Sequence, residues 1–170
     1  MSGMTFRKST KSDIDAIMRI IEDARLSLRQ RGIDQWQNDY PNRTTIENDI
    51  DHGYSYILEQ DNTVVGTVAV IFGKEITYAE IFDGNWLSNK EYAVIHRIAV
   101  VSRFMGRGFA SVMIGNIERM CLEKGVRSIR VDTHEKNESM QRLLDKNGFT
   151  YCGIIYLLDK SKRLAYEKLL

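Results

Sequence analysis

The sequence predicts an α/β fold in which helices cover a mixed β-sheet. Three observations predict it: apolar side chains recur at helical spacing in four segments, seven other segments are β-rich, and turn residues separate them. The chain has 170 residues, of which 43% are hydrophobic and 28% charged, and this composition is ordinary for a globular protein. We therefore expect one domain over residues 1–170.

The first half of the chain is predicted to hold a strand, two helices and a hairpin. Thr10 and Asp13 form a candidate capping box, with Ser12 as a competing N-cap. Asp61-Asn62 between two β-rich runs is a hairpin signal. The predicted elements are a strand over 4–8, a helix over 12–30, a loop over 33–43, a helix from 44 or 45 to 52, and strands over 54–60 and 63–72.

The second half is predicted to alternate strands and helices before it ends in two strands. Gly125 and Gly148 are the expected helix stops. The predicted elements are a loop or irregular strand over 74–90, a strand over 91–101, a helix over 107–124, a strand over 127–133, a helix over 137–146, and strands over 151–158 and 163–169. The resulting order, β-α-α-β-β-β-α-β-α-β-β, is typical of a mixed sheet covered by helices.

The cysteines and the apolar runs indicate the cellular compartment in which the protein is expected. Cys121 and Cys152 are the only cysteines, and their spacing fits no metal site, so we expect two buried free thiols rather than a disulfide, and no metal. The N-terminal stretch MSGMTFRKST lacks the apolar core of a signal peptide, and no apolar run is long enough to span a bilayer. We expect a cytoplasmic protein that does not bind membranes.

The charges are unevenly distributed although the formal net charge is only +1. Residues 30–95 carry four Lys or Arg against eleven Asp or Glu, whereas residues 96–170 carry fourteen against eight. This asymmetry suggests a cationic ligand for the acidic middle and an anionic ligand for the basic C-terminal half. An ordinary solvated surface is the alternative. The basic half lacks the aromatic-interleaved stripe of nucleic-acid-binding proteins, so we expect no nucleic-acid partner.

Two glycines lie in the turn between the predicted strand over 91–101 and the next predicted helix. Gly106 and Gly108 lack a Cβ, so a ligand can approach their backbone closely. The following helix N-terminus has unpaired N–H groups and a partial positive charge, and Arg103 and Arg107 add attraction for an anion. Phosphate or pyrophosphate binding is therefore predicted. The motif is neither G-x-G-x-x-G, because Ser111 replaces the third glycine, nor a P-loop.

Three segments together resemble the GCN5-related N-acetyltransferase (GNAT) superfamily: HRIAV, MGRGFA and THEKNESMQRLLDKNGF. The cofactor turn of that family reads Arg/Gln-x-x-Gly-x-Gly/Ala, and MGRGFA matches it in register. Gly108 and Ala110 occupy the small positions, and Gly106 matches a common glycine. Met105 departs from the usual Arg or Gln. The resemblance is close over residues 92–158 and matches the N-terminal half in element order only.

The resemblance implies a fold and a cofactor. The fold is α/β (α+β), with a mostly antiparallel sheet, a splayed parallel strand pair over 92–101 and 127–133, and helices on both faces. Acetyl-CoA is the implied acyl donor, and its pantetheine arm pairs with strand backbone in such enzymes. The implied cofactor-binding residues are Ile98, Ala99, Val100, Met105, Gly106, Arg107, Gly108, Phe109, Ala110 and Asn137.

The resemblance also assigns catalytic roles. The Val100 N–H is the expected oxyanion donor, and His96 is the candidate base, on the same face as Ile98 and Val94 if the strand alternates. The proton-donating Tyr common in the family is replaced by Leu144. Tyr156 is the candidate acid, with Tyr151 or water as alternatives.

The acceptor pocket is expected from the variable loops. Trp36, Tyr40 and Trp86 are the candidate substrate-binding residues, beside carboxylates at Asp34, Asp39, Glu75, Glu80 and Asp83. The predicted function is acetyl transfer from acetyl-CoA to the primary amine of a small cationic molecule, by direct attack in a ternary complex, in a possible homodimer. The alternatives are acetylation of a protein N-terminus or lysine, and a CoA-binding sensor without catalysis.

Overall fold

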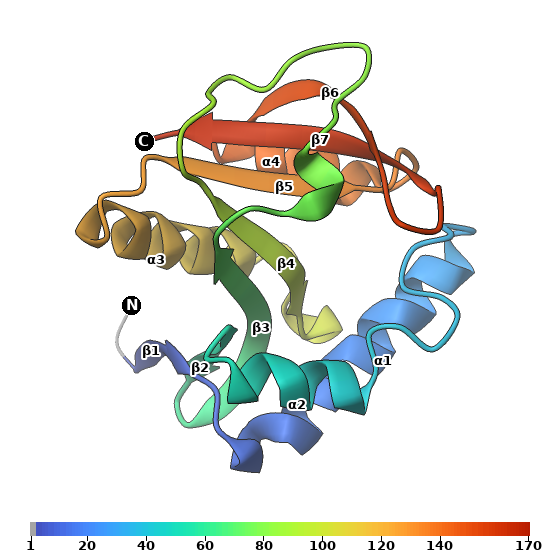
Figure 1. Cartoon of the computed structure of the whole chain (residues 1–170). Helices are drawn as coiled ribbons and strands as arrows, with labels where there is room; N and C mark the ends of the chain where they lie inside the picture. The colour runs from blue at the N-terminus through green and yellow to red at the C-terminus, as the bar shows by residue number, and fades with distance from the viewer. Residues whose placement is uncertain (1–2) are drawn as a thin grey trace. The chain divides into compact units, whose positions relative to one another are not determined.

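The computed structural model describes residues 3–170, so Met1 and Ser2 of the predicted domain lie outside the described residues. Figure 1 shows the elements that the described residues form. The helices are α1 Ile14–Gln30, α2 Arg43–Asp51, α3 Phe109–Glu123 and α4 Glu138–Lys146, with 3-10 turns η1 Lys11–Asp13, η2 Ile76–Tyr78 and η3 Ser102–Phe104. The strands are β1 Met4–Lys8, β2 Ser55–Gln60, β3 Thr63–Phe72, β4 Ala93–Val100, β5 Ser128–Thr133, β6 Thr150–Tyr156 and β7 Lys162–Leu169.

The strands of the described region form a mixed sheet in the order β1-β2-β3-β4-β5-β7-β6. The predicted parallel pair is β4 with β5, and their pairing covers only Ala93–Val94 and Ile129–Arg130. The predicted fold class and element order are thus confirmed. By its contacts the chain divides into two compact units. The first contains the chain up to Val70 together with His96–Asn116, and the second contains Ile71–Ile95 together with Ile117–Leu170.

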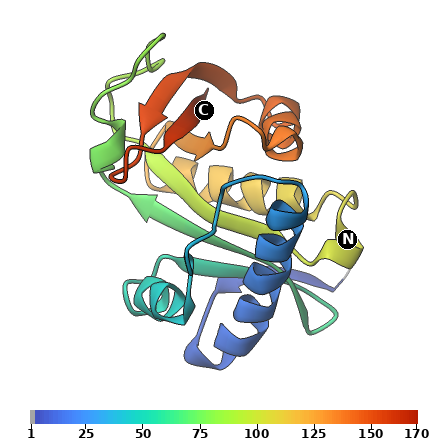
Figure 2. The ribbon, with the colours of Figure 1, turned by 90° about the vertical axis from the view of Figure 1, so that its right-hand side faces the viewer.

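In the first unit, helices cover both faces of β2 and β3. Ile17 and Ile21 of α1 and Ile46 of α2 form one buried cluster with Ile57 of β2, and Figure 2 shows α1 lying across these strands. On the other face, a Cβ added to Gly66 of β3 would lie 3.0 Å from the Met113 sulfur of α3. The missing side chain of Gly66 thus leaves room for the end of the Met113 side chain.

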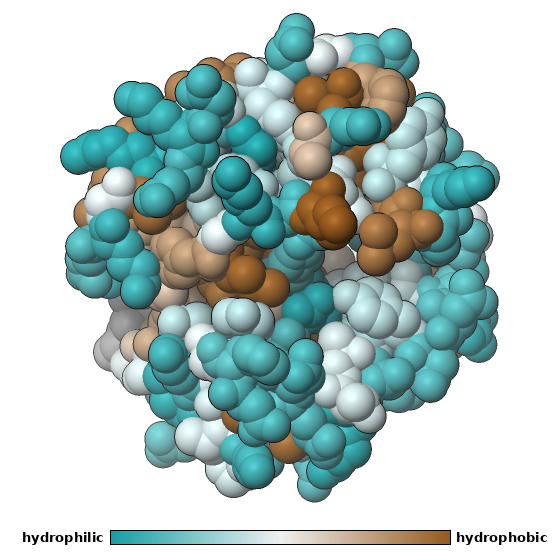
Figure 3. Space-filling model, viewed as in Figure 1, coloured by the Kyte–Doolittle hydropathy of each residue, from teal (hydrophilic) through white to brown (hydrophobic). Residues whose placement is uncertain are grey.

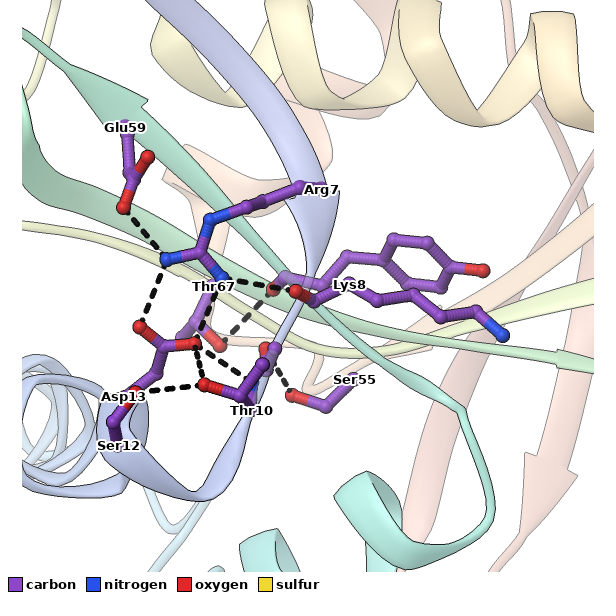
Figure 4. Close-up of polar contacts among 10 residues, drawn as sticks. Arg7, Lys8, Thr10, Ser12, Asp13, Ser55, Glu59 and Thr67 are labelled. Carbon is purple, nitrogen blue, oxygen red and sulfur yellow. Dashed lines mark hydrogen bonds and ion pairs between the residues drawn. The ribbon is translucent and has the colours of Figure 1, made fainter.

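A polar network fixes the start of α1 against β1 and β2 (Figure 4). The Arg7 guanidinium donates to both carboxylate oxygens of Asp13, at 2.9 and 3.0 Å, and to Glu59 at 2.7 Å. The Thr10 N–H donates to the Asp13 carboxylate at 2.7 Å. This is the hydrogen bond from the N-cap backbone to the N3 side chain in a capping box, so that part of the predicted capping box is confirmed. The Arg7 guanidinium holds the pKa of the Asp13 carboxyl below its usual range.

In the second unit, residues 79–90 form a strap along β6. Phe82 and Ile154 exchange two backbone hydrogen bonds of 2.8 Å, which makes an isolated bridge. The strap approaches so closely that a Cβ on Gly84 would lie 1.9 Å from the Cys152 carbonyl oxygen. The segment is thus the loop with irregular strand character that its sequence predicts, and the bridge covers part of an edge strand.

A buried ion pair holds the far end of the strap. Glu167 of β7 is 0% exposed and lies 3.4 Å from Arg130 Nε of β5. The Arg130 guanidinium also donates to the Ser88 carbonyl at 2.6 Å and lies 4.1 Å from the centre of the Trp86 ring. These contacts connect the strap to both central strands of the unit.

Several predicted boundaries are shifted by local chemistry. Helix α2 begins at Arg43 because Asn42, rather than Thr44 or Thr45, is its N-cap and accepts from the Thr45 N–H at 3.0 Å. Helix α3 begins at Phe109 rather than at residue 107, because Gly108 has a left-handed φ of 81°. The predicted hairpin turn is confirmed, since both of its residues also have positive φ.

The surface and the cysteines agree with the composition. The face in Figure 3 is mostly hydrophilic, with hydrophobic atoms over η2 and over the β6–β7 turn, where Ile76 and Leu158 are 73% and 82% exposed. Cys121 and Cys152 are buried free thiols, as predicted. Within residues 3–170, no helix combines the length and the apolar character that a membrane span requires.

Candidate functional site

The turn between β4 and α3 exposes its backbone. Gly106 and Gly108 have φ values of 82° and 81°, a left-handed conformation that favours glycine. An added Cβ on either glycine would meet no atom within 4 Å, so the space beside both is open. The turn therefore combines an unusual backbone path with free access for a ligand, as the sequence predicts.

Aromatic and cationic side chains stack beside this turn. The guanidinium carbons of Arg103 and Arg107 lie 4.7 and 5.2 Å from the centre of the Phe104 ring. That ring also contacts the Phe109 ring edge-on, at 5.6 Å between centroids. Because Phe109 is buried, it anchors Phe104 and thereby holds two positive charges next to the glycines.

The N-terminus of α3 opens directly after Gly108. The first helical hydrogen bond runs from the Val112 N–H to the Gly108 carbonyl, at 3.0 Å. The amides before Val112 therefore point toward the helix N-terminus, where the helix dipole favours an anion. Together with the two arginines, this arrangement is suited to a diphosphate group.

The last residues of β4 present amides on the side away from β3. The Val101 N–H donates to the Val65 carbonyl of β3 at 2.9 Å. Successive amides of a strand point to opposite edges, so the N–H groups of Val100 and Ile98 point away from β3. Ala99 is buried, whereas Ile98 and Val100 are half-buried. The geometry thus leaves two β4 amides directed toward the edge where a peptide-like group can pair.

His96 lies on β4 just before a break in its regular geometry. Its side chain is half-buried, and the next residue, Arg97, has a left-handed φ of 54°. A left-handed residue inside a strand shifts the side-chain alternation. Val94 and His96 both precede Arg97, so their expected common face is unaffected, whereas the expected common face of His96 and Ile98 across Arg97 stays a prediction.

Arg97 forms a buried clamp that sequence reasoning missed. Its guanidinium donates to the two carboxylate oxygens of Asp49 on α2, at 2.8 and 2.7 Å, and to the Tyr40 hydroxyl at 2.8 Å. The Arg97 and Asp49 side chains are only 11% and 6% exposed. In the sequence, Asp49 is one of several acidic residues, and spacing alone gives it no partner.

Of the three predicted substrate-binding aromatics, only Tyr40 is exposed, at 47%. Trp36 packs against the α1–α2 core cluster, and its carbonyl accepts from Arg25 Nε at 3.0 Å. Trp86 packs with Tyr78 at 5.1 Å between ring centroids, and its indole N–H donates to the Tyr78 carbonyl at 3.0 Å. The two tryptophans therefore order their loops by packing.

Asn137 and Tyr156 belong to the second unit. The Asn137 side chain caps α4 by accepting from the Met140 N–H at 3.2 Å, so the capping half of its expected dual role is confirmed. Tyr156 is exposed and contacts the Phe82 ring edge-on at 5.5 Å. Tyr156 is thus a partly exposed aromatic of β6, and its role as proton donor stays a prediction.

The remaining predicted cofactor residues lie in the turn and the first turn of α3. Met105 is 58% exposed, so the position that departs from the family motif is a surface position. Arg107 and Gly106 are also exposed, whereas Gly108 and Ala110 are half-buried. A ligand at this turn therefore meets mainly backbone and arginine side chains.

Comparison with known proteins agrees with this geometry. The profile of the acetyltransferase (GNAT) family matches residues 16–149, most of the chain. The chain belongs to the GNAT family. A GNAT acetyltransferase from Streptococcus agalactiae is 40% identical, with a TM-score of 0.90 over 99% of this chain and 96% of that one. A comparison with curated proteins gave no significant match.

More distant solved structures share the fold. The PaiA N-acetyltransferase from Thermoplasma acidophilum, solved with coenzyme A, is 16% identical, with a TM-score of 0.72 and full coverage of both chains. The ribosomal-protein-S18-alanine N-acetyltransferase from Escherichia coli is 13% identical, with a TM-score of 0.66 over 98% of this chain and 93% of that one.

As a GNAT protein, this chain is an acyl-CoA-dependent N-acetyltransferase. One position bears on its chemistry: Leu144 of α4, where the family often has a proton-donating Tyr, is fully buried. A hydroxyl is thus replaced by a core side chain, and a proton donor, if the reaction uses one, comes from another residue or from water.

Proposed function

We propose that this enzyme transfers the acetyl group of acetyl-CoA to the primary amine of a small cationic molecule, by direct attack in a ternary complex. The observation that carries the proposal is the open glycine turn at the N-terminus of α3. Its left-handed glycines, free space and flanking arginines fit the diphosphate of CoA. The family membership supports the same donor.

The direction of the β4 amides supports acetyl-CoA as the donor. In this proposal, the Ile98 backbone pairs with the pantetheine arm, and the Val100 N–H donates to the thioester oxygen as negative charge develops on it. Asn137 adds a contact to the cofactor beyond its capping bond. The amide direction set by the Val101–Val65 hydrogen bond supports these roles.

The acceptor amine must lose a proton, because a free alkylammonium has a pKa near that of lysine, about 10. His96 takes this proton, directly or through water, and the amine nitrogen then attacks the thioester carbonyl. The tetrahedral intermediate collapses with release of the CoA thiolate, which receives a proton from Tyr156 or from water. The second N–H proton of the attacking nitrogen replaces the proton given to the thiolate, so neutral amide and CoA thiol are formed and the proton held by His96 passes to solvent. The exposure of Tyr156 supports this assignment.

The charge distribution supports a cationic acceptor. Residues 30–95 have a large acidic excess, and Asp34 and Asp39 are exposed in the loop that also carries Tyr40. Carboxylates near a binding site raise the local concentration of cations. The two buried free thiols suit a reducing compartment, so the proposal places the enzyme in the cytoplasm.

A protein N-terminus or lysine is the second candidate acceptor, favoured by one observation. Trp36 and Trp86 were predicted to bind the substrate, but both are partly buried and pack against core clusters. Tyr40 is the one exposed aromatic among the three predicted substrate-binding residues, which leaves room for a larger acceptor such as a peptide. A CoA sensor without catalysis, suggested by Leu144, is the third candidate.

An acceptor screen tests the proposal. The purified enzyme is incubated with acetyl-CoA and a panel of polyamines, amino alcohols, amino-acid amides and N-terminal or lysine peptides, and thiol release is followed. Transfer to small amines with at least tenfold higher kcat/KM than to peptides is the expected result. Preference for peptides selects the second candidate, and cofactor binding without any transfer selects the sensor.

A further inference from the structure

We propose that the Tyr40 hydroxyl binds the acceptor as a hydrogen-bond donor, that Arg97 and Asp49 position it, and that the preferred acceptor is a primary amine carrying a neutral oxygen. A hydroxyl or amide carbonyl close to the amine satisfies this requirement. The inference rests on the proposed function and names the acceptor class within it.

The clamp has one defined geometry. Arg97 Nε and one terminal nitrogen donate to the Asp49 carboxylate at 2.8 and 2.7 Å, which is a bidentate pair. The other terminal nitrogen donates to the Tyr40 hydroxyl at 2.8 Å. Because Asp49 fixes the guanidinium plane, the direction of the bond to Tyr40 is fixed as well.

This geometry decides which way the Tyr40 proton points. Arg97 is always protonated and has no acceptor atom, so Tyr40 is the acceptor in their hydrogen bond. The phenolic hydrogen then lies on the side away from the guanidinium. Tyr40 is consequently left as a donor toward its surroundings, and the residue as a whole is about half exposed. A ligand that meets this hydroxyl must offer an acceptor atom.

The charges of Arg97 and Asp49 beside Tyr40 cancel, and this restricts the kind of ligand that the Tyr40 hydroxyl attracts. The Arg97 charge is compensated by the buried Asp49 carboxylate, so the pair offers little net attraction to an anion. Tyr40 thus selects by hydrogen bonding rather than by charge. A cationic amine drawn by the acidic residues therefore gains most if it also carries a neutral oxygen.

The backbone of Arg97 agrees with a role beyond packing. Its φ of 54° is a left-handed conformation that costs a non-glycine residue free energy. This residue lies between His96 and Ile98, which the proposed function assigns to proton transfer and cofactor binding. The clamp therefore joins the Tyr40 loop to the part of β4 where the reaction is proposed to occur.

The test uses matched amines that differ by one oxygen. Ethanolamine is compared with propylamine, and 3-aminopropan-1-ol with butylamine, by kcat/KM in the thiol-release assay. The wild-type enzyme is expected to prefer the oxygen-bearing member of each pair about tenfold. Tyr40→Phe removes only the hydroxyl and is expected to reduce the preference to about twofold or less, with an unchanged KM for acetyl-CoA.

Two further variants separate positioning from folding. Arg97→Lys keeps the charge but lacks the planar fork, and it is expected to lose the preference; combined with Tyr40→Phe it is expected to add nothing further. Tyr56→Phe is the matched control, because it also removes one phenolic hydroxyl, from a ring that stacks on Phe6 of β1. If Arg97→Lys fails to fold, Tyr40→Phe alone decides.

The outcomes are distinguishable. A preference that survives in Tyr40→Phe, or a wild-type enzyme that acetylates both members of each pair equally, overturns this inference and leaves the proposed function intact. Absence of transfer to every amine in the acceptor screen overturns both. Loss of the preference in Tyr40→Phe but not in Tyr56→Phe supports the inference.

Discussion

The Leu87 N–H donates a 2.7 Å hydrogen bond to the carboxylate of Glu167, eighty residues away in the chain. Glu167 is at the same time the buried partner of Arg130. One carboxylate thus serves as the ionic partner of a central strand and as the anchor of the strap. The stability of the second unit is therefore expected to depend on this side chain.

Glu167→Ala is expected to lower the free energy of unfolding by about 3 kcal/mol or more, because it leaves Arg130 buried without its anion. Glu167→Gln is expected to cost less, since its amide oxygen still accepts from Leu87. Urea unfolding measures both. Glu138→Ala is the control, because Glu138 forms an exposed pair with Arg142 and its loss is expected to change little. Equal effects of Glu138→Ala and Glu167→Ala would refute the assigned role.

Gly108→Glu is expected to abolish the rise in Tm that acetyl-CoA gives the wild-type enzyme, through steric block and like charge at the turn. The control is Gly32→Glu, because Gly32 also has a left-handed φ, of 69°, and open space around it. Both variants bear the same backbone cost, so only their response to acetyl-CoA should differ. A retained shift in Gly108→Glu would place the cofactor elsewhere.

His96→Gln is expected to lower kcat about 100-fold on the acceptor found by the screen, since it removes the proposed base while keeping a polar side chain of similar size. His52→Gln serves as control because His52 is exposed at the end of α2, with Nδ1 2.8 Å from the Asn48 carbonyl. Steady-state kinetics decide, and a kcat within twofold of wild type would exclude His96 as the base.

Asp13→Asn is expected to destabilise the enzyme at pH 7 by about 1–3 kcal/mol, because it removes charge-assisted bonds from Arg7. The folded-state pKa of Asp13 is lowered, so its contribution is present above the unfolded pKa of about 4 and is lost as the pH falls toward the folded pKa. Denaturation at pH 7 and pH 3 should show the gap between variant and wild type shrinking in acid. A gap that widens in acid contradicts this sign.

The thiols of Cys121 and Cys152 are expected not to react in the thiol-release assay, so they add no background signal. Burial raises the pKa of Cys121 to about 11 and also raises that of Cys152. At pH 8 a thiol of pKa about 11 is about one-thousandth thiolate, so reaction is slow in the folded enzyme. Ellman's reagent should label neither cysteine within minutes until urea is added. Fast labelling without urea would contradict the assigned burial.

The sequence predicted the fold and the open glycine turn because both depend on local patterns. Helical spacing, hairpin residues and the glycines at 106 and 108 are signals carried by neighbouring residues. Boundaries shifted where one cap outcompeted another, as when Asn42 replaced the predicted Thr44 or Thr45 at the start of α2.

The Arg97–Asp49 clamp and the packing of the two tryptophans could not be predicted from local sequence patterns. Arg97 and Asp49 are 48 residues apart, and a bidentate pair leaves no periodic trace in the sequence. Trp36 and Trp86 stand in polar loops, so their neighbours suggest exposure, yet each packs against a cluster built from distant segments. Long-range packing decided these side chains, and composition does not encode it.

The packing of the tryptophans has an optical consequence. The chain has two tryptophans, Trp36 in the first unit and Trp86 in the second. Each tryptophan is therefore an intrinsic fluorophore in one unit. Replacing one of them by Phe leaves a single-tryptophan protein whose fluorescence reports on the unit that holds the remaining tryptophan. Coincident or separate emission changes during unfolding would read out, without any added dye, whether the two halves of this acetyltransferase melt as one cooperative body.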